Sequence, residues 1–152
     1  MFHTFAHVFL RRLAYECGYS SNSLRERIYC TTDGDKVGGI LIYTADSDSE
    51  GSMGGLVELG FPEKLQDIFV SAISDSTWCS SDPVCRESHK QGLDGLNKAA
   101  CHACALVSET SCAHMNVFLD RVVLSGGTDV DSSKKEPRGF FANLVDSEVV
   151  VS

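Results

Sequence analysis

Five of the seven cysteines in this 152-residue chain fall within a single stretch, residues 78–121. Cys101 and Cys104 form a CxxC pair, a spacing that lets two thiolates turn back onto one metal ion. Tetrahedral zinc needs four soft ligands, which proteins usually supply as two local pairs or as one pair and two single residues. The stretch therefore predicts a structural zinc site that draws its ligands from five thiols, those of Cys79, Cys85, Cys101, Cys104 and Cys112.

The choice of four ligands stays open at this point. We favour a set that joins the CxxC pair to one cysteine on either side, with Cys79 as the first substitute: Cys85, Cys101, Cys104 and Cys112. Nearby imidazoles are further candidates, because histidine nitrogen is also a common zinc ligand. These are His89, His102 and His114.

The same cysteines have three other interpretations. Free cysteines are often small buried hydrophobic residues, and an isolated CxxC is also the motif of a redox dithiol. A redox pair normally starts a helix in a cysteine-poor domain, whereas three further cysteines crowd this segment. A disulfide framework is disfavoured because the total of seven is odd and no signal peptide precedes the first expected helix. Zinc remains the favoured interpretation.

The composition fits one ordinary domain. With 43% hydrophobic and 22% charged residues, the chain can bury a normal core, and it has no apolar run of the roughly 20 residues that a membrane span needs. A net charge of -8 disfavours direct non-specific DNA binding, which depends on lysine and arginine. We expect any DNA contact to be made by a partner of this chain. We expect the chain to bind neither a membrane nor a small-molecule substrate. The many thiols predict a reducing cytoplasm.

Hydrophobic periodicity predicts two long helices and one buried strand. Apolar residues recur at three- and four-residue steps over residues 2–17, up to Gly18, and again over residues 62–74. Residues 40–43 form a continuous apolar run typical of a buried strand. We predict an α+β fold, a helix-dominated single domain with one or two buried strands and a zinc knuckle. Because the apolar face begins at the second residue, we expect either an excised domain or a piece split from something longer.

Weaker signals predict shorter elements. Ser23 and Glu26 have capping-box spacing, which predicts a short helix through Tyr29. Residues 115–123 show the pattern of one more amphipathic helix, ended by two glycines. These elements divide the chain into a zinc-binding domain, residues 1–125, and a linker and tail, residues 126–152, of which residues 139–146 are expected to dock back on the domain.

A glycine-rich acidic loop, residues 44–55, follows the expected strand. It lacks the ending of a nucleotide-binding loop, and its acids would repel phosphate: Asp46, Asp48, Glu50 and, just beyond, Glu58. The spacing does not fit a calcium loop of the EF-hand type. We expect a close-packed structural turn that depends on Gly51, Gly54 and Gly55. Farther upstream, His3 and His7 lie four residues apart and could hold a metal, although packed histidines are the favoured interpretation.

Several motifs, in this order, resemble a known domain family. They are HTFAH at residues 3–7, CGYS at 17–20, SLRERIY at 23–29, IYTAD at 42–46, SEGSMGGL at 49–56, WCSSDPVC at 78–85, ACHAC at 100–104, ETSC at 109–112 and NVFLDR at 116–121. Together they resemble the C-terminal, helicase-associated, cysteine-rich domain of DrmB, a component of the DISARM anti-phage defence system. The same domain type forms the C-terminal end of DNA helicases similar to MrfA and Hrq. The resemblance covers roughly residues 2–125.

This resemblance implies a non-catalytic, zinc-binding accessory domain of a DNA-processing complex. It implies a DrmA-like helicase subunit as partner and DNA contact through that complex. The chain itself carries no Walker A lysine loop and no helicase acidic box, so it cannot hydrolyse ATP alone. Residues just past the last cysteine could cap the metal cluster or contact a partner, and two arginines near the N-terminus are further contact candidates. These residues are Asn116, Asp120, Arg121, Arg25 and Arg27.

An enzyme is the competing hypothesis, for instance a metal-dependent nuclease or hydrolase that uses the acidic loop. A catalytic zinc keeps an open coordination position and usually takes histidine or carboxylate ligands with a general base nearby. A site filled by cysteines closes that position, which favours the structural role. A zinc deaminase is excluded more firmly, because no H-x-E precedes the CxxC pair.

Overall fold

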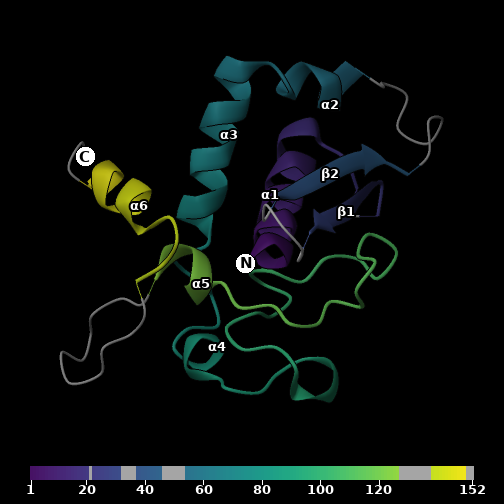
Figure 1. Ribbon diagram of the computed structural model, residues 1–152. Helices are drawn as coiled ribbons and strands as arrows, with labels where there is room; N and C mark the ends of the chain where they lie inside the picture. Colours follow the sequence, from purple (N-terminus) through teal and green to yellow (C-terminus); the bar gives the residue numbers. More distant parts are fainter. Residues whose placement is uncertain (21, 32–36, 46–53, 127–137, 150–152) are drawn as a thin grey trace.

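Helix α1 (Phe2–Cys17) occupies the middle of the domain, between a second long helix and a small sheet (Figure 1). The computed structural model describes residues 1–20, 22–31, 37–45, 54–126 and 138–149. Burial of the apolar stripe of α1 against both neighbours explains the helical periodicity of the sequence. The helix ends at Gly18, which adopts the left-handed conformation (φ 68°) and donates its N–H to the last turn.

Helix α3 (Pro62–Asp75) packs along α1, and α2 (Gly54–Leu59) precedes it. Between α1 and α3, aromatic rings form a cluster that also takes in Phe141, just before the C-terminal helix α6 (Ala142–Val149). Helix α6 contacts both α3 and the short helix α5 (Val122–Ser125). The two long helices are confirmed within one residue of their predicted ends.

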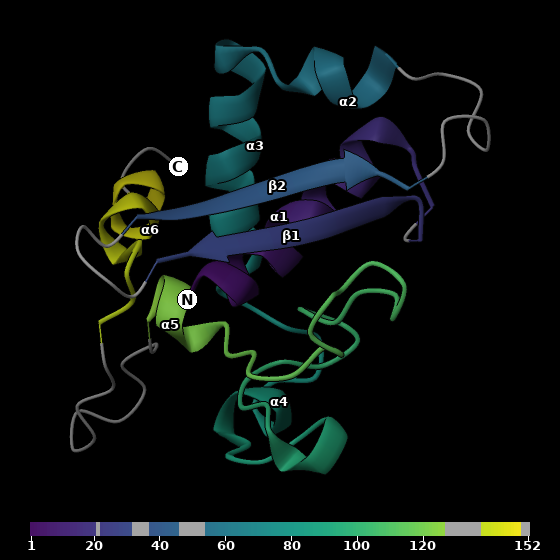
Figure 2. The same cartoon turned by 45° about the vertical axis from the view of Figure 1, so that its right-hand side comes forward.

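The sheet has two antiparallel strands, β1 (Leu24–Cys30) and β2 (Gly38–Thr44), and lies across α1 (Figure 2). Strand β2 confirms a strand at residues 40–43, but the prediction that the strand is buried is wrong, because Leu41 and Tyr43 are 47% and 39% exposed. The short helix predicted from Ser23 to Tyr29 is wrong, because this segment is β1. Its side chains alternate, with Leu24, Glu26 and Ile28 facing inward. A buried glutamate hides this alternation in a hydropathy pattern, and its side chain is used inside the domain rather than as a helix cap.

Residues 76–121 form a lobe of turns below α1, with only two short helical elements, α4 (Val84–Glu87) and η1 (Leu93–Gly95) (Figures 1 and 2). The helix predicted over residues 115–123 is wrong except for Val122 and Val123, which begin α5. Met115, Asn116 and Phe118 have φ values of 55–60°, which no right-handed helix accommodates. Met115 and Phe118 are also 67% and 70% exposed, so the apparent apolar stripe does not face a core.

The two lobes differ in their apolar cores. The lobe formed by α1, α3 and the sheet, called the helical lobe below, packs large side chains around Leu10, Leu13, Leu24 and Ile68. The lobe of residues 76–121 has a much smaller cluster, built on Leu119 and two alanines. The glycine-rich loop falls mostly outside the described residues, including Gly51, whereas Gly54 and Gly55 begin α2. Among the described helices, none is long and apolar enough to cross a membrane.

Candidate metal centre

Four thiols converge in the lobe of residues 76–121, and their sulfur atoms all lie within 4.8 Å of one another: Cys79, Cys85, Cys101 and Cys104. The Sγ separations are 3.5 Å for Cys79 to Cys101, 3.7 Å for Cys85 to Cys104, and 3.8 Å within the CxxC pair. A tetrahedron with zinc–sulfur bonds of about 2.3 Å has edges of about 3.8 Å. The four sulfur atoms therefore fit tetrahedral zinc.

Backbone geometry aims these thiols at one point. The CxxC turn closes through hydrogen bonds from the N–H groups of Cys104 and Ala105 to the Cys101 carbonyl, at 3.2 and 2.9 Å. The backbone N–H of Cys101 also points at the Cys104 sulfur, at 3.3 Å, and that of Ser81 at the Cys79 sulfur, at 3.4 Å. N–H groups directed at sulfur stabilise the thiolate form that binds a metal.

The ionisation of the thiols is uneven. Burial opposes ionisation of Cys101, but the N–H of Ala103 and hydrogen bonds from neighbouring thiols lower its pKa to about 7. Burial raises the pKa of Cys104 far above its usual range, and the pKa of Cys85 is also raised, again chiefly by burial. The charge of further thiolates at this spot must therefore be balanced by a cation.

An ion pair between Arg121 and Asp82 supports the four-thiol group next to Cys79. Arg121 is fully buried (0% exposed) and donates to the carboxylate of Asp82 and, at 3.1 Å, to the carbonyl of Ser76. The same carboxylate accepts the backbone N–H of Cys79 at 3.0 Å. This arrangement fixes the first cysteine relative to the end of α3.

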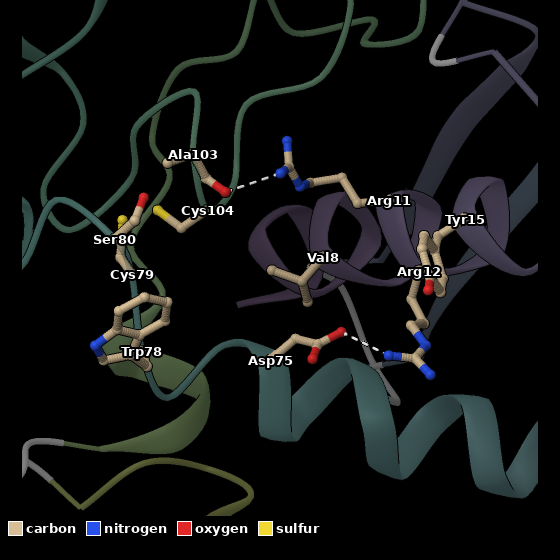
Figure 3. Close-up of a pocket in the computed structure, with 10 residues that line it drawn as sticks. All are labelled: Val8, Arg11, Arg12, Tyr15, Asp75, Trp78, Cys79, Ser80, Ala103 and Cys104. Carbon is tan, nitrogen blue, oxygen red and sulfur yellow. Dashed lines mark hydrogen bonds and ion pairs between the residues drawn. The ribbon is translucent and has the colours of Figure 1, made fainter.

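Helix α1 holds the CxxC turn from the other side. The guanidinium of Arg11 donates to three carbonyl groups in and after the turn, those of His102, Ala103 and Leu106, at 3.1, 2.9 and 2.8 Å. Figure 3 shows this side chain reaching to Ala103 across a groove of about 360 Å³ that runs beside the cysteines. Exposed Trp78 and Tyr15 border the groove.

Comparison with known proteins agrees with this chemistry. Residues 5–105 match the family described as the MrfA Zn-binding domain, and the matched range contains all four clustered cysteines. The chain belongs to the MrfA Zn-binding domain family. It is also 43% identical, over 145 residues, to the DISARM protein DrmB of Bacillus paralicheniformis. That alignment covers 95% of this chain but 24% of DrmB, so the chain spans about a quarter of that protein's length.

The family resemblance and the zinc cofactor predicted from the sequence are thus confirmed. Of the favoured ligand set, the structure of this chain brings Cys85, Cys101 and Cys104 together, with Cys79 rather than Cys112 as the fourth thiol of the group. Cys112 lies with His3, His7 and Glu26 instead. Of the imidazoles considered as alternatives, none belongs to the four-thiol group: His89 and His102 are exposed, and His114 stacks edge-on against His3.

The candidate contact residues divide into buried and exposed ones. Asn116 is buried and exchanges two hydrogen bonds with the backbone of Val107, at 3.0 and 3.1 Å, while Asp120 accepts the N–H of Val122. Together with buried Arg121, these residues cap and order the lobe from inside. Only Arg25 and Arg27 remain on the surface, side by side on the outer face of β1.

Sequence reasoning missed three polar residues of this lobe and its contacts, of which Glu26 and Asn97 are buried and Asp82 is half-buried. Asp82 supports the first cysteine, and Glu26 reaches Cys112 from β1. Asn97 is 0% exposed and holds two distant turns, accepting the N–H of Leu119 at 2.9 Å and donating to the carbonyl of Asn116 at 2.7 Å. The only sequence signal was their position inside or opposite the cysteine-rich stretch.

Proposed function

We propose that this chain is a non-catalytic, zinc-binding accessory domain of a DISARM-type DNA-processing complex, where it assembles with a helicase subunit. The observation that carries the proposal is the composition of the metal site. The group at the CxxC turn consists of thiols alone, with no carboxylate or imidazole among its four members. Such a site supplies a crosslink, whereas catalytic zinc needs an open position and a general base.

The proposed ligands are Cys79, Cys85, Cys101 and Cys104. Bound zinc supplies a fixed charge and a crosslink, while the protein orients the thiolates, donates N–H groups to them and surrounds them with the Arg121–Asp82 pair and Arg11. Because little apolar area is buried in this lobe, metal binding would provide most of its folding free energy. The product is a rigid surface rather than a reaction centre.

The outer face of the sheet is the proposed contact surface for the helicase subunit. Arg25, Arg27 and Tyr29 lie together on this face of β1, and Tyr29 is 54% exposed. The two arginines pair with Tyr43 and Leu41 of β2, which are 39% and 47% exposed. Arginine and tyrosine are the residue types enriched in the energetic centres of protein interfaces. All five of these side chains are exposed to solvent.

A binding measurement tests this assignment. A DrmA-like helicase subunit would be immobilised, and its binding of the zinc-loaded wild-type chain would be compared with its binding of the Arg25→Glu/Arg27→Glu double variant. We expect the double variant to bind at least about tenfold more weakly, because two attractive contacts become repulsive. The matched control, Lys90→Glu/Lys98→Glu, reverses two exposed charges on the other lobe and should bind like the wild type. Equal affinity of all three proteins would reject the sheet face.

DNA contact is proposed to arise through the complex. A net charge of -8 leaves the isolated chain without the excess of cations that phosphate binding requires. Arg11 and Arg12, the basic residues beside the groove, are already engaged by loop carbonyls and by acids, respectively. DNA binding by the isolated zinc-loaded chain at physiological salt, with an affinity matching that of the complex, would contradict this part of the proposal.

The alternative enzyme, which would use the acidic loop, gains no support from the described acid at that loop. The acids Asp46, Asp48 and Glu50 lie outside the described residues. The fourth acid, Glu58, is exposed and forms an ion pair with Lys64 at 2.5 Å.

A further inference from the structure

A second group of potential metal ligands lies at the junction of the two lobes. It consists of His3, His7, Glu26 and Cys112, with ligand atoms all within 4.8 Å of one another. The four side chains come from α1, β1 and the lobe of residues 76–121. Three of them are buried, and the His3 side chain is 14% exposed, so this is an interior cluster rather than a surface accumulation of polar groups.

The atoms face one another at short range. His3 Nε2 lies 3.2 Å from Cys112 Sγ and 3.7 Å from Glu26 Oε1, and His7 Nε2 lies 4.0 Å from the same carboxylate oxygen. The two histidines are four residues apart on α1 and therefore lie on one face of the helix. A helical histidine pair of this spacing is a common way to present two imidazoles to one ion.

Several of these atoms have no hydrogen-bond partner of normal geometry. They are His7 Nε2 and both carboxylate oxygens of Glu26, although each is fully buried. Burying a polar atom without a partner costs about 1–3 kcal/mol, and more for a charged one. Native interiors rarely leave three such atoms pointing at the same spot, which indicates that another group belongs there.

The tautomer of His7 directs a nitrogen lone pair at the cluster. Its Nδ1 lies 2.9 Å from the Ala105 carbonyl, which can only accept, so Nδ1 carries the proton and Nε2 presents a lone pair to the cluster. Imidazoles that bind metals are oriented by a carbonyl or carboxylate on the other ring nitrogen in this way. The Cys112 sulfur is likewise oriented as a ligand, because the N–H groups of His114 and Asn116 point at it at 3.3 and 3.4 Å.

A hydrogen bond between His3 Nε2 and Cys112 Sγ, at 3.2 Å, accounts for only part of the arrangement. A protonated Glu26 could donate to His7 Nε2, but their 4.0 Å separation is beyond hydrogen-bond range. Two imidazoles, a carboxylate and a thiol thus surround one point with lone pairs.

We propose that His3, His7, Glu26 and Cys112 form a second site for a divalent transition-metal ion, with Zn²⁺ the best fit. Two nitrogens, one sulfur and one oxygen are all established zinc donors, and this mixed set excludes the hard cations that prefer oxygen alone. One carboxylate and one thiolate neutralise a divalent ion, which suits a buried position. The ion would join α1 and β1 to the cysteine-rich lobe.

Metal counting on the whole 152-residue chain tests the proposal. Zinc per chain would be determined by elemental analysis, both as purified and after equilibration with excess zinc and desalting. We expect two ions per wild-type chain and one in each of two variants, Glu26→Gln and Cys112→Ala. Two controls change residues outside both groups, His89→Gln and Cys17→Ser, and should retain two ions. A Cys104→Ser variant reports on the four-thiol site separately and should lose the other ion.

Cadmium NMR distinguishes the two sites by their donors. The cadmium-loaded chain should give one strongly deshielded signal from the four-sulfur site and a second, less deshielded signal that disappears in Glu26→Gln and Cys112→Ala. If a variant misfolds, it loses both signals, and the other variant then decides. One ion per wild-type chain under both loading conditions would overturn the proposal. Two ions that persist in both variants would overturn it equally, and neither result affects the four-thiol site.

Discussion

The two lobes of this domain maintain their shape by different means. In the helical lobe, α1, α3 and the sheet bury leucine, isoleucine and phenylalanine side chains against one another. In the lobe of residues 76–121, a small cluster of alanine and leucine is supplemented by thiols, a buried ion pair and hydrogen bonds from asparagine side chains. The first lobe depends on the hydrophobic effect, and the second depends on specific polar contacts and a metal.

This contrast explains where regular secondary structure occurs. Helices and strands satisfy their own backbone groups and can therefore bury a continuous apolar face. The cysteine-rich lobe buries too little apolar surface to select one backbone conformation, so crosslinks between turns must do it. Four sulfur atoms within 4.8 Å provide such a crosslink without requiring a helix or a strand. The predictions below separate the two modes of stabilisation.

Removal of zinc should have the largest effect, and it should be confined mainly to one lobe. Chelation, or the Cys101→Ser variant, is expected to unfold residues 76–121, because structural zinc contributes on the order of 10 kcal/mol in small domains. Amides of α1 and α3 should retain part of their protection in hydrogen exchange. Added zinc should restore the chelated wild type but not the variant. Equal loss of protection in both lobes would show that they fold as one unit.

Breaking the buried ion pair should have the next largest effect. Asp82→Asn leaves the fully buried Arg121 without its counter-charge, which typically costs about 3–5 kcal/mol. Urea unfolding of the zinc-loaded protein would measure the loss. The double variant Asp82→Asn/Arg121→Met removes the unpaired charge and should recover part of it. No recovery would indicate that Arg121 acts mainly through its hydrogen bond to Ser76.

The two metal groups should also differ in pH dependence. At pH 7, Cys85 and Cys104, whose pKa values burial raises, still hold their protons, and Cys101, at about 7, is partly ionised. Zinc binding at the four-thiol group must therefore displace the protons of Cys85 and Cys104 and part of that of Cys101. The affinity of this group for zinc should fall as pH decreases. His3 and His7, with pKa values of about 4, are already neutral at pH 7 and release none.

Calorimetry in buffers of different ionisation enthalpy measures this proton release. The Cys112→Ala variant isolates the four-thiol group, and Cys104→Ser isolates the second group. We expect the first of these variants to release more protons per ion than the second. The reverse order would mean that the thiols of the four-thiol group are ionised before the metal binds.

The smallest effect should come from the contact between α1 and the CxxC turn. Arg11→Met removes hydrogen bonds to three carbonyl groups and is expected to cost about 1–2 kcal/mol and to speed zinc loss to a chelator. The neighbouring Arg12→Met removes only ion pairs with the exposed side of Glu16 and Asp75, worth about 0–1 kcal/mol. Similar zinc-loss rates in both variants would show that α1 does not steady the turn.

The sequence was informative where structure follows from local periodicity or short spacing. The helical repeat of residues 2–17 and 62–74 and the CxxC turn at Cys101 each depend on residues close in the chain, and each was predicted correctly. Strand β1 was missed because the inward-facing Glu26 interrupts an otherwise apolar alternation. A charged residue on the buried face is explained only by partners from distant segments.

The separation of Cys112 from the other cysteines could not be predicted for a related reason. Spacing alone makes Cys112 as good a ligand as Cys79, since both are single residues flanking the pair. Two features place Cys112 apart from the other cysteines. Met115, Asn116 and Phe118 adopt left-handed conformations and turn the chain after Cys112. The backbone N–H of Glu26 donates to the Ser111 carbonyl at 3.1 Å. Such contacts between distant turns leave no periodic trace in a sequence.

The backbone pairing between α5 and the start of the C-terminal segment has a practical consequence. The N–H groups of Phe140 and Phe141 bond to the carbonyls of Val123 and Leu124, at 3.0 and 2.8 Å, so the chain resumes beside the point where it left at Gly126. Residues 127–137 therefore connect two anchored neighbours, and doubling such a connection costs only about 0.6 kcal/mol of closure entropy. A fluorescent reporter or an affinity tag inserted there would leave both lobes, and both metal groups, in place.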